Sequence, residues 1–221
     1  MVILLGLAAA VLYGTGDFLG GLASRRVQVL PVLMLAETAG VIVALLAVAM
    51  SPGPVRTAGL AWGIGAGLIG GLGLIIFYTG LAAGPMSVVA PVSGLVSTIL
   101  PVAAALAEGE RPGAGVYAGA LLCLAAIVLA SSAGDSSRAH GTSPALRHRL
   151  RGSGRALGYG IASGASFGLF FLLIRNAGQS GELWPVAAAR VGELAVVLIT
   201  AAVLRRSLRP VSYTHLTLPT N

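Results

Sequence analysis

Long apolar runs separated by short polar segments form the main pattern of the chain. The runs lie at 2–23, 29–50, 58–82, 86–107, 114–132, 157–174 and 183–204. Each is close to the roughly 20 residues that a helix needs to cross a bilayer, whereas strands of a membrane barrel are about half as long and alternate in polarity. Leu, Ala, Val and Gly occur all round each run, which suits helices surrounded by lipid and by each other. The pattern predicts an all-α, polytopic transmembrane helix bundle of seven helices.

The composition argues against a soluble globular protein and against a disordered one. Hydrophobic residues make up 56% of the 221 residues and charged residues only 10%, whereas a soluble domain carries about 25% charged residues. The net charge of +7 comes from arginine, since the chain has no lysine. The arginines gather between the apolar runs, as in membrane-flanking loops, so we expect the lipid bilayer as a partner and no nucleic acid.

A polar, arginine-rich linker at 133–156 divides the chain into five apolar runs before it and two after it. The segment Tyr13–Arg26 can be laid on Ser163–Asn176, and the runs that follow also match loosely. This similarity indicates an internal repeat, as in many transporters, although any two helices rich in Gly and Leu look somewhat alike. We therefore expect a first five-helix repeat over 1–132 and the first two helices of a second repeat over 157–208.

The tail, residues 209–221, changes abruptly from Ala, Gly and Leu to Thr, Tyr, His and Pro. It is too short and too polar to cross a membrane. We expect it to be an artefact of sequencing-adapter read-through, with a genuine short tail as the alternative. On the first interpretation the natural protein continues further and the chain is C-terminally truncated.

Ionisable residues inside the apolar runs are candidates for a transport site. Asp17, Glu37 and Glu193 lie within runs, and Arg190 precedes Glu193 by one helical turn. A charge at mid-bilayer costs roughly 2.5–3.5 kcal/mol on insertion scales, so it usually faces a partner or a water-filled cavity. We expect these groups to bind substrate charge or to relay protons, with Glu37 as the strongest candidate. The alternatives are a mutual Arg190–Glu193 pair that only neutralises its helix and a position of Asp17 at the membrane edge.

Two prolines in the fourth run, Pro91 and Pro101, predict a kinked or broken helix, because proline lacks an amide proton and clashes with the preceding turn. Carbonyls freed inside a membrane need neighbours, and Ser93 with nearby hydroxyls can supply them. We expect this helix to line a substrate path, with a static kink as the alternative. Tyr13 and Tyr78 are candidate walls of the same pocket, although aromatic residues in membrane proteins more often mark the interface.

Glycines recur every four residues in two runs and form smooth faces on which another backbone can approach closely. The residues of these faces are Gly63, Gly67, Gly71, Gly160, Gly164 and Gly168. A G-x-G-x-x-G sequence overlaps the first face, but it follows no strand and lacks an acid at the required spacing, which argues against a dinucleotide site. No catalytic motif or metal-ligand spacing is found, so we expect neither an enzyme nor a cofactor or metal.

The segments YGTGDFLGGLASRR and GIGAGLIGGLGLIIFYTGLAAGPMSVVAPVSGLVSTILPVAAALAEGER resemble the first repeat of an EamA-type transporter of the drug/metabolite transporter superfamily. The most specific part is Tyr78–Arg111, with Y-x-x-L-x-x-G-P, VVAPV, a second proline and GER. The resemblance implies ten helices in two five-helix repeats of opposite orientation around a central cavity. It places these candidates on lining helices: Tyr13, Asp17, Glu37, Tyr78, Pro91, Ser93 and Arg190.

The resemblance also implies a gradient-driven secondary transporter that exports small organic molecules such as amino acids or drugs. We expect it in the cell (plasma) membrane of a bacterium, with a proton as the candidate coupling ion and a homodimer as a candidate assembly. The alternatives are a membrane structural or assembly protein, in which the glycines serve packing only, and a truncated fragment without activity. Orientation stays open, because the arginine distribution places the N-terminus outside whereas relatives are taken to have it inside.

Overall fold

The computed structural model describes residues 2–51, 53–111, 146–177 and 183–204, together with parts of 113–129. The helices with defined bounds are α1 (Val2–Arg26), α2 (Val29–Met50), α3 (Thr57–Ala83), α4 (Met86–Ala107), α6 (Leu146–Ala177) and α7 (Trp184–Val203). Each of these six is long and apolar enough to cross a membrane. The described residues between 114 and 129 are helical too, and no strand occurs in the described ranges. The expected all-α, polytopic bundle is therefore confirmed.

The helix after the polar linker starts earlier than the apolar pattern indicated. α6 begins at Leu146, within the segment expected to be linker, and its part that is apolar enough to span a membrane is Gly154–Ala177. Leucine and arginine are good helix formers, so the helix continues beyond its apolar part. Residues 131–145 and 205–221, which hold the rest of the linker and the tail, lie outside the described residues.

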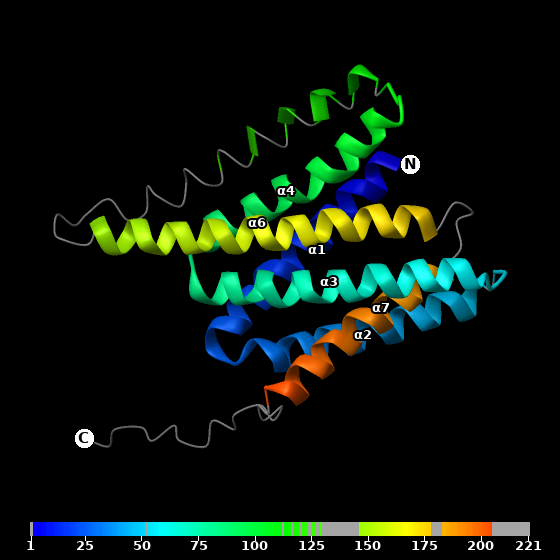
Figure 1. The fold of residues 1–221 in the computed structure, drawn as a ribbon, viewed down its shortest axis with the longest axis horizontal. Coiled ribbons are helices and arrows are strands. Elements are labelled where there is room, and N and C mark those ends of the chain that lie inside the picture. The colour runs from blue at the N-terminus through cyan, green and yellow to red at the C-terminus, as the bar shows by residue number, and fades with distance from the viewer. Residues whose placement is uncertain are drawn as a thin grey trace.

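The third helix is the centre of the bundle. α3 lies between α6 and α7 and packs extensively against both, while α6 also packs on α4, and α7 on α2 (Figure 1). α3 is the most buried of the spanning helices, whereas α1 is the least buried and contacts mainly α3. In Figure 1, α1 and α6 run in opposite directions, and so do α2 and α7. An inverted repeat requires such opposed pairs, although the repeat itself stays a prediction.

Glycines of α3 explain how α7 approaches so closely. They face backbone carbonyls one turn apart, in the pairs Gly63–Pro185, Gly67–Ala189 and Gly71–Glu193. A Cβ added at Gly67 would overlap the carbonyl of Ala189, so only a hydrogen fits there. Without side chains between them the two backbones are held by van der Waals contact and weak Cα–H···O interactions, which replace the hydrophobic drive that lipid does not supply.

The same arrangement recurs between α6 and α4. The pairs of glycine and carbonyl are here Gly160–Val89, Gly164–Ser93 and Gly168–Ser97. A Cβ at Gly164 would lie 2.6 Å from the Ser93 carbonyl oxygen, which is too close for an unchanged backbone. Two of the three most extensive interfaces, α3–α7 and α4–α6, therefore combine a glycine row with a carbonyl row of the same four-residue period.

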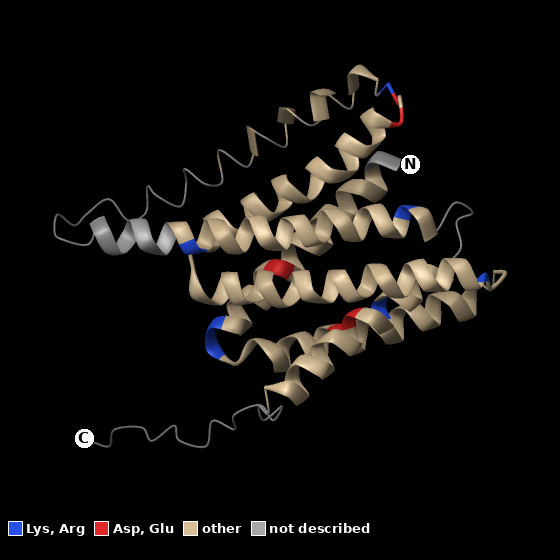
Figure 2. Cartoon of the chain, viewed as in Figure 1, with Lys and Arg blue, Asp and Glu red and all other residues tan. Residues whose placement is uncertain are grey.

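Charged residues lie mostly at the helix ends, with a few at the middle of the bundle (Figure 2). At one end, the Arg25 guanidinium donates hydrogen bonds to the carbonyls of Leu81 and Gly84, at 3.0 and 2.7 Å, which satisfies backbone acceptors where α3 ends. In the last turn of α6, Arg175 contacts Glu108 and Glu110, after the end of α4, at 2.6 and 3.0 Å. The charges at mid-bundle belong to the site described next.

Candidate functional site

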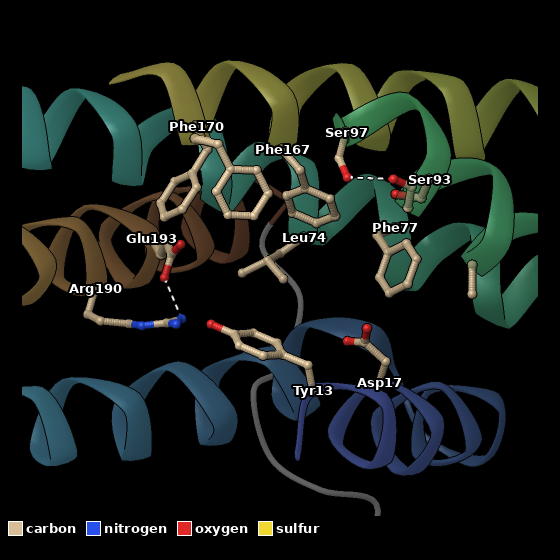
Figure 3. Close-up of a pocket in the computed structure, with 13 residues that line it drawn as sticks. Tyr13, Asp17, Leu74, Phe77, Ser93, Ser97, Phe167, Phe170, Arg190 and Glu193 are labelled. Atoms are coloured by element: carbon tan, nitrogen blue, oxygen red, sulfur yellow. Dashed lines mark hydrogen bonds and ion pairs between the residues drawn. The ribbon is translucent and has the colours of Figure 1, made fainter. Parts of the chain in front are cut away.

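A cavity of about 240 Å³ lies inside the bundle, between α1, α3, α4, α6 and α7. Its walls divide by chemistry into a charged side, an aromatic side and a hydroxyl-bearing side (Figure 3). The lining residues are Tyr13, Asp17, Leu74, Phe77, Ala90, Ser93, Gly94, Ser97, Phe167, Phe170, Phe171, Arg190 and Glu193. Five helices thus converge on one space large enough for a small organic molecule.

The charged side is built by three ionisable groups on two helices. On α7, the Arg190 guanidinium donates a hydrogen bond to Glu193 at 2.8 Å. The same nitrogen, Nη1, lies 3.6 Å from Oε2 of Glu37, which comes from α2. Glu37 and Glu193 are only 5% and 4% exposed, and Oε2 of Glu37 is buried without a hydrogen-bond partner. Arg190 therefore holds two buried carboxylates, and the expected pair with Glu193 is one part of a larger cluster.

Two residues of α1 complete this side of the cavity. Tyr13 and Asp17 are four residues apart and share one face of the helix. Figure 3 shows the Tyr13 hydroxyl directed toward the Arg190 guanidinium and the Asp17 carboxyl directed into the cavity toward Phe77. In the described part of the chain, Asp17 makes no hydrogen bond and no ion pair. Asp17 is thus a half-buried carboxyl whose neighbour across the cavity is an aromatic ring.

The opposite side of the cavity is aromatic. Phe77 of α3 meets Phe167 of α6 edge to face, with ring centroids 5.8 Å apart. Phe170 and Phe171 meet in the same way at 5.4 Å. Such T-shaped pairs are favourable because the positive edge of one ring faces the negative face of the other. The result is an apolar wall with ring faces and edges available to a ligand.

The hydroxyl-bearing side is formed by α4, which is one continuous helix through Pro91 and Pro101. Of the expected kinked or broken helix, the broken form is therefore not found, and a role of this helix in a substrate path stays a prediction. The Ser97 hydroxyl bonds the Gly94 carbonyl at 2.9 Å, and the Ser163 hydroxyl bonds Ser93 at 3.0 Å. Neither hydroxyl reaches a carbonyl that a proline frees.

The carbonyl that Pro101 frees, four residues earlier at Ser97, is the one against which Gly168 packs. The neighbouring helix therefore covers this carbonyl with a glycine rather than with a side chain.

Residues 1–132 match the EamA-like transporter family. The chain belongs to this family. No curated protein and no solved structure gives a match. Membership confirms the resemblance seen in the sequence, and with the six spanning helices it makes the chain a multi-pass membrane protein of the transporter type. The match includes α1 to α4, whereas α6 and α7 lie beyond it.

The structure of this EamA-family transporter brings together most of the residues predicted for its site. Those that line the cavity are Tyr13, Asp17, Ser93, Arg190 and Glu193. Glu37 does not line the cavity itself, but its carboxylate contacts Arg190, which does. Tyr78 and Pro91 are not part of the lining, and Tyr78 packs instead on Gly20 and edge to face on Phe77. The roles of all these residues in transport stay predictions.

Sequence reasoning missed the aromatic wall of the transporter. Phe167, Phe170 and Phe171 stand at positions i, i+3 and i+4, which places them on one helix face. That spacing was the available signal, but in a membrane it is equally typical of a face that contacts lipid. Among the residues that the structure describes, no group of three or more His, Cys, Asp and Glu could hold a metal ion.

Proposed function

We propose that this EamA-family member is a secondary transporter that exports small organic molecules such as amino acids or drugs across the cell membrane of a bacterium. The driving force is an ion gradient, with the proton as coupling ion. The observation that carries the proposal is the cluster of Glu37, Arg190 and Glu193 at the wall of the central cavity. A homodimer stays a prediction.

The charge count of the cluster supports proton coupling. Two buried carboxylates share a single guanidinium, so the fully ionised cluster carries a net negative charge in a region of low dielectric constant. Uncompensated charge in such a place is costly, and binding of one proton removes it. A proton and a substrate that both act on this charge can therefore be exchanged across the membrane.

The glycine interfaces support movement around the cavity. α7 carries Arg190 and Glu193, and α4 carries Ser93, and each of these helices rests on a glycine face. Such faces contain no interlocking side chains, so small shifts of α7 and α4 require little repacking. Shifts of this kind are what alternate opening of a central site requires.

The experiment is transport by the full chain in proteoliposomes with an imposed pH gradient. Uptake of radiolabelled amino acids and of radiolabelled benzyltrimethylammonium, a small organic cation with one ring, is compared for the wild type, Glu37→Gln and Glu110→Gln. Glu110→Gln is the matched control, because Glu110 lies outside the cavity and Arg175 keeps its contact with Glu108. We expect the pH gradient to accelerate uptake in the wild type and in the control. In Glu37→Gln, the increase in uptake rate caused by the gradient should be about tenfold smaller.

Two outcomes contradict the proposal. Wild-type vesicles that accumulate none of the probes, although the protein is folded and inserted, indicate a packing protein or an inactive fragment. Uptake by Glu37→Gln with an unchanged dependence on the pH gradient removes the cluster from the coupling mechanism.

A further inference from the structure

We infer that the cavity selects an organic cation carrying one aromatic ring, in preference to zwitterions and anions. The inference rests on the proposed function in that it takes this cavity as the substrate site. It deepens that function by naming the charge and shape of the substrate.

The first step is the balance of charges around the cavity. The ionisable groups that face it or its charged wall come from α1 (Tyr13, Asp17), α2 (Glu37), α3 (Tyr78, behind Phe77) and α7 (Arg190, Glu193). The residues of α4 and α6 that line it are uncharged. Three carboxyl groups thus face one guanidinium, and the site attracts positive charge unless two of the three are protonated.

The second step concerns the single positive group. A zwitterion or an anion needs a cation for its carboxylate, and Arg190 is the only basic residue in the lining that the structure describes. Its Nη1 already contacts Glu193 at 2.8 Å and Glu37 at 3.6 Å. A substrate carboxylate would have to compete with two carboxylates that are held in place by the helices. Arg190 is therefore an internal counter-ion rather than a receptor for a substrate anion.

The third step is the unused negative group. Asp17 points into the cavity and has neither a hydrogen-bond partner nor an ion-pair partner in the described part of the chain. A carboxylate in this position remains uncompensated until a cation or a proton arrives. Asp17 is thus the group on which a substrate cation would be held.

The fourth step is the aromatic wall opposite Asp17. Phe77 and Phe167 present their rings toward the space that the Asp17 carboxyl enters (Figure 3). The face of an aromatic ring attracts a cation, and its edge packs well against another ring. A ligand with a positive headgroup and one ring would satisfy both sides of the cavity at once.

The size of the cavity is sufficient for one ring and a headgroup. Its volume is about 240 Å³, and a cavity of about 150 Å³ is enough to hold benzene. The difference leaves room for a small headgroup such as trimethylammonium beside the ring. Ser93 and Ser97 are uncharged, and their hydroxyl oxygens carry partial negative charge that attracts such a headgroup without a hydrogen bond.

The test is equilibrium binding to the purified full chain in detergent, measured by isothermal titration calorimetry. The probe is benzyltrimethylammonium, compared with the zwitterion phenylalanine and the anion benzoate. We expect the cation to bind at least about tenfold more tightly than either. Asp17→Asn should lose most of this preference, Asp17→Glu should keep it, and the control Glu110→Gln should match the wild type. Phe77→Leu should weaken binding of the cation, while a melting curve in detergent checks that each variant is folded.

The inference is overturned if phenylalanine or benzoate binds more tightly than the cation, if none of the three probes binds, or if folded Asp17→Asn binds the cation like the wild type. Binding in detergent needs neither a gradient nor transport, so the result is separate from the proposed function. Tight binding of the cation without any flux in proteoliposomes would reject the proposed function and keep the inference. Flux of amino acids without binding of the cation would do the reverse.

Discussion

Gly67 of α3 rests directly on the backbone carbonyl of Ala189 on α7, and no side chain fits between the two helices at this point. Ala189 stands directly before Arg190 and one turn before Glu193, which is the last residue of this row on α7. The close approach of α3 and α7 therefore also determines the depth at which the charged cluster meets the cavity in this conformation. Packing and site geometry depend on the same glycine face.

Gly67→Ala should destabilise the protein, because the new methyl group meets backbone atoms of Ala189 that cannot rotate away. Overpacking of this kind costs about 1–3 kcal/mol. Thermal unfolding in detergent measures the effect. Gly65→Ala is the matched control, since Gly65 has no atom within 4 Å of an added Cβ and lies two residues before Gly67, on another face of the same helix. Equal melting temperatures for the two variants would show that the α3–α7 contact is not as close as described.

Gly164→Ala should act in the same way on the second interface, where the added Cβ would lie 2.6 Å from the Ser93 carbonyl oxygen. The control on α6 is Gly158→Ala, because no atom lies within 4 Å of a Cβ at Gly158. We expect only the first change to lower the melting temperature. Since Ser93 lines the cavity, Gly164→Ala should also weaken binding of benzyltrimethylammonium, and unchanged binding would show that α4 can shift without altering the site.

The helices and their glycine faces were accessible to sequence analysis because lipid imposes a length and a composition on each span. The apolar pattern placed α2 and α4 at the bounds that the structure has, whereas the start of α6 at Leu146 was missed because arginine-rich sequence can be helical outside the apolar layer. The spacing of residues within one segment is enough to predict helix bounds and glycine faces.

The assembly of the site was less accessible, because it depends on contacts between distant segments. Arg190 and Glu193 are visible as a pair at a spacing of three, but nothing in the sequence indicates that Glu37 of α2 joins them. The phenylalanines of α6 were overlooked for a related reason. In a membrane, an apolar residue that faces lipid and one that faces a cavity have the same chemistry, and only the packing of α6 on α3 and α4 distinguishes them.

Loss of Arg190 should be far more harmful than loss of Arg175. Arg190→Gln leaves Glu37 and Glu193 buried without a counter-ion, and breaking a buried pair in this way costs about 3–5 kcal/mol. Arg175 and its partners Glu108 and Glu110 have 44–58% exposed side chains, so Arg175→Gln should cost about 0–1 kcal/mol. Unfolding in detergent compares them.

The triple variant Glu37→Gln/Arg190→Gln/Glu193→Gln is the check on the Arg190 prediction. It removes the unpaired carboxylates, so it should recover much of the stability that Arg190→Gln loses. No recovery would mean that the arginine stabilises the protein through packing of its side chain rather than through its charge.

Binding of benzyltrimethylammonium should weaken as the pH falls. Protons and the cation compete for the same negative groups, so each carboxyl that becomes protonated lowers the attraction of the cavity for a positive ligand. The sign follows from the charge count alone: low pH disfavours the cation, and high pH favours it. Titration calorimetry at a series of pH values measures the effect, in buffers of different ionisation enthalpy so that proton release on binding is counted as well. Asp17→Asn should flatten the pH dependence, whereas Glu110→Gln should retain it. A wild-type affinity that is constant across the acidic range, or that rises as the pH falls, would mean that the ligand is not held by a carboxylate.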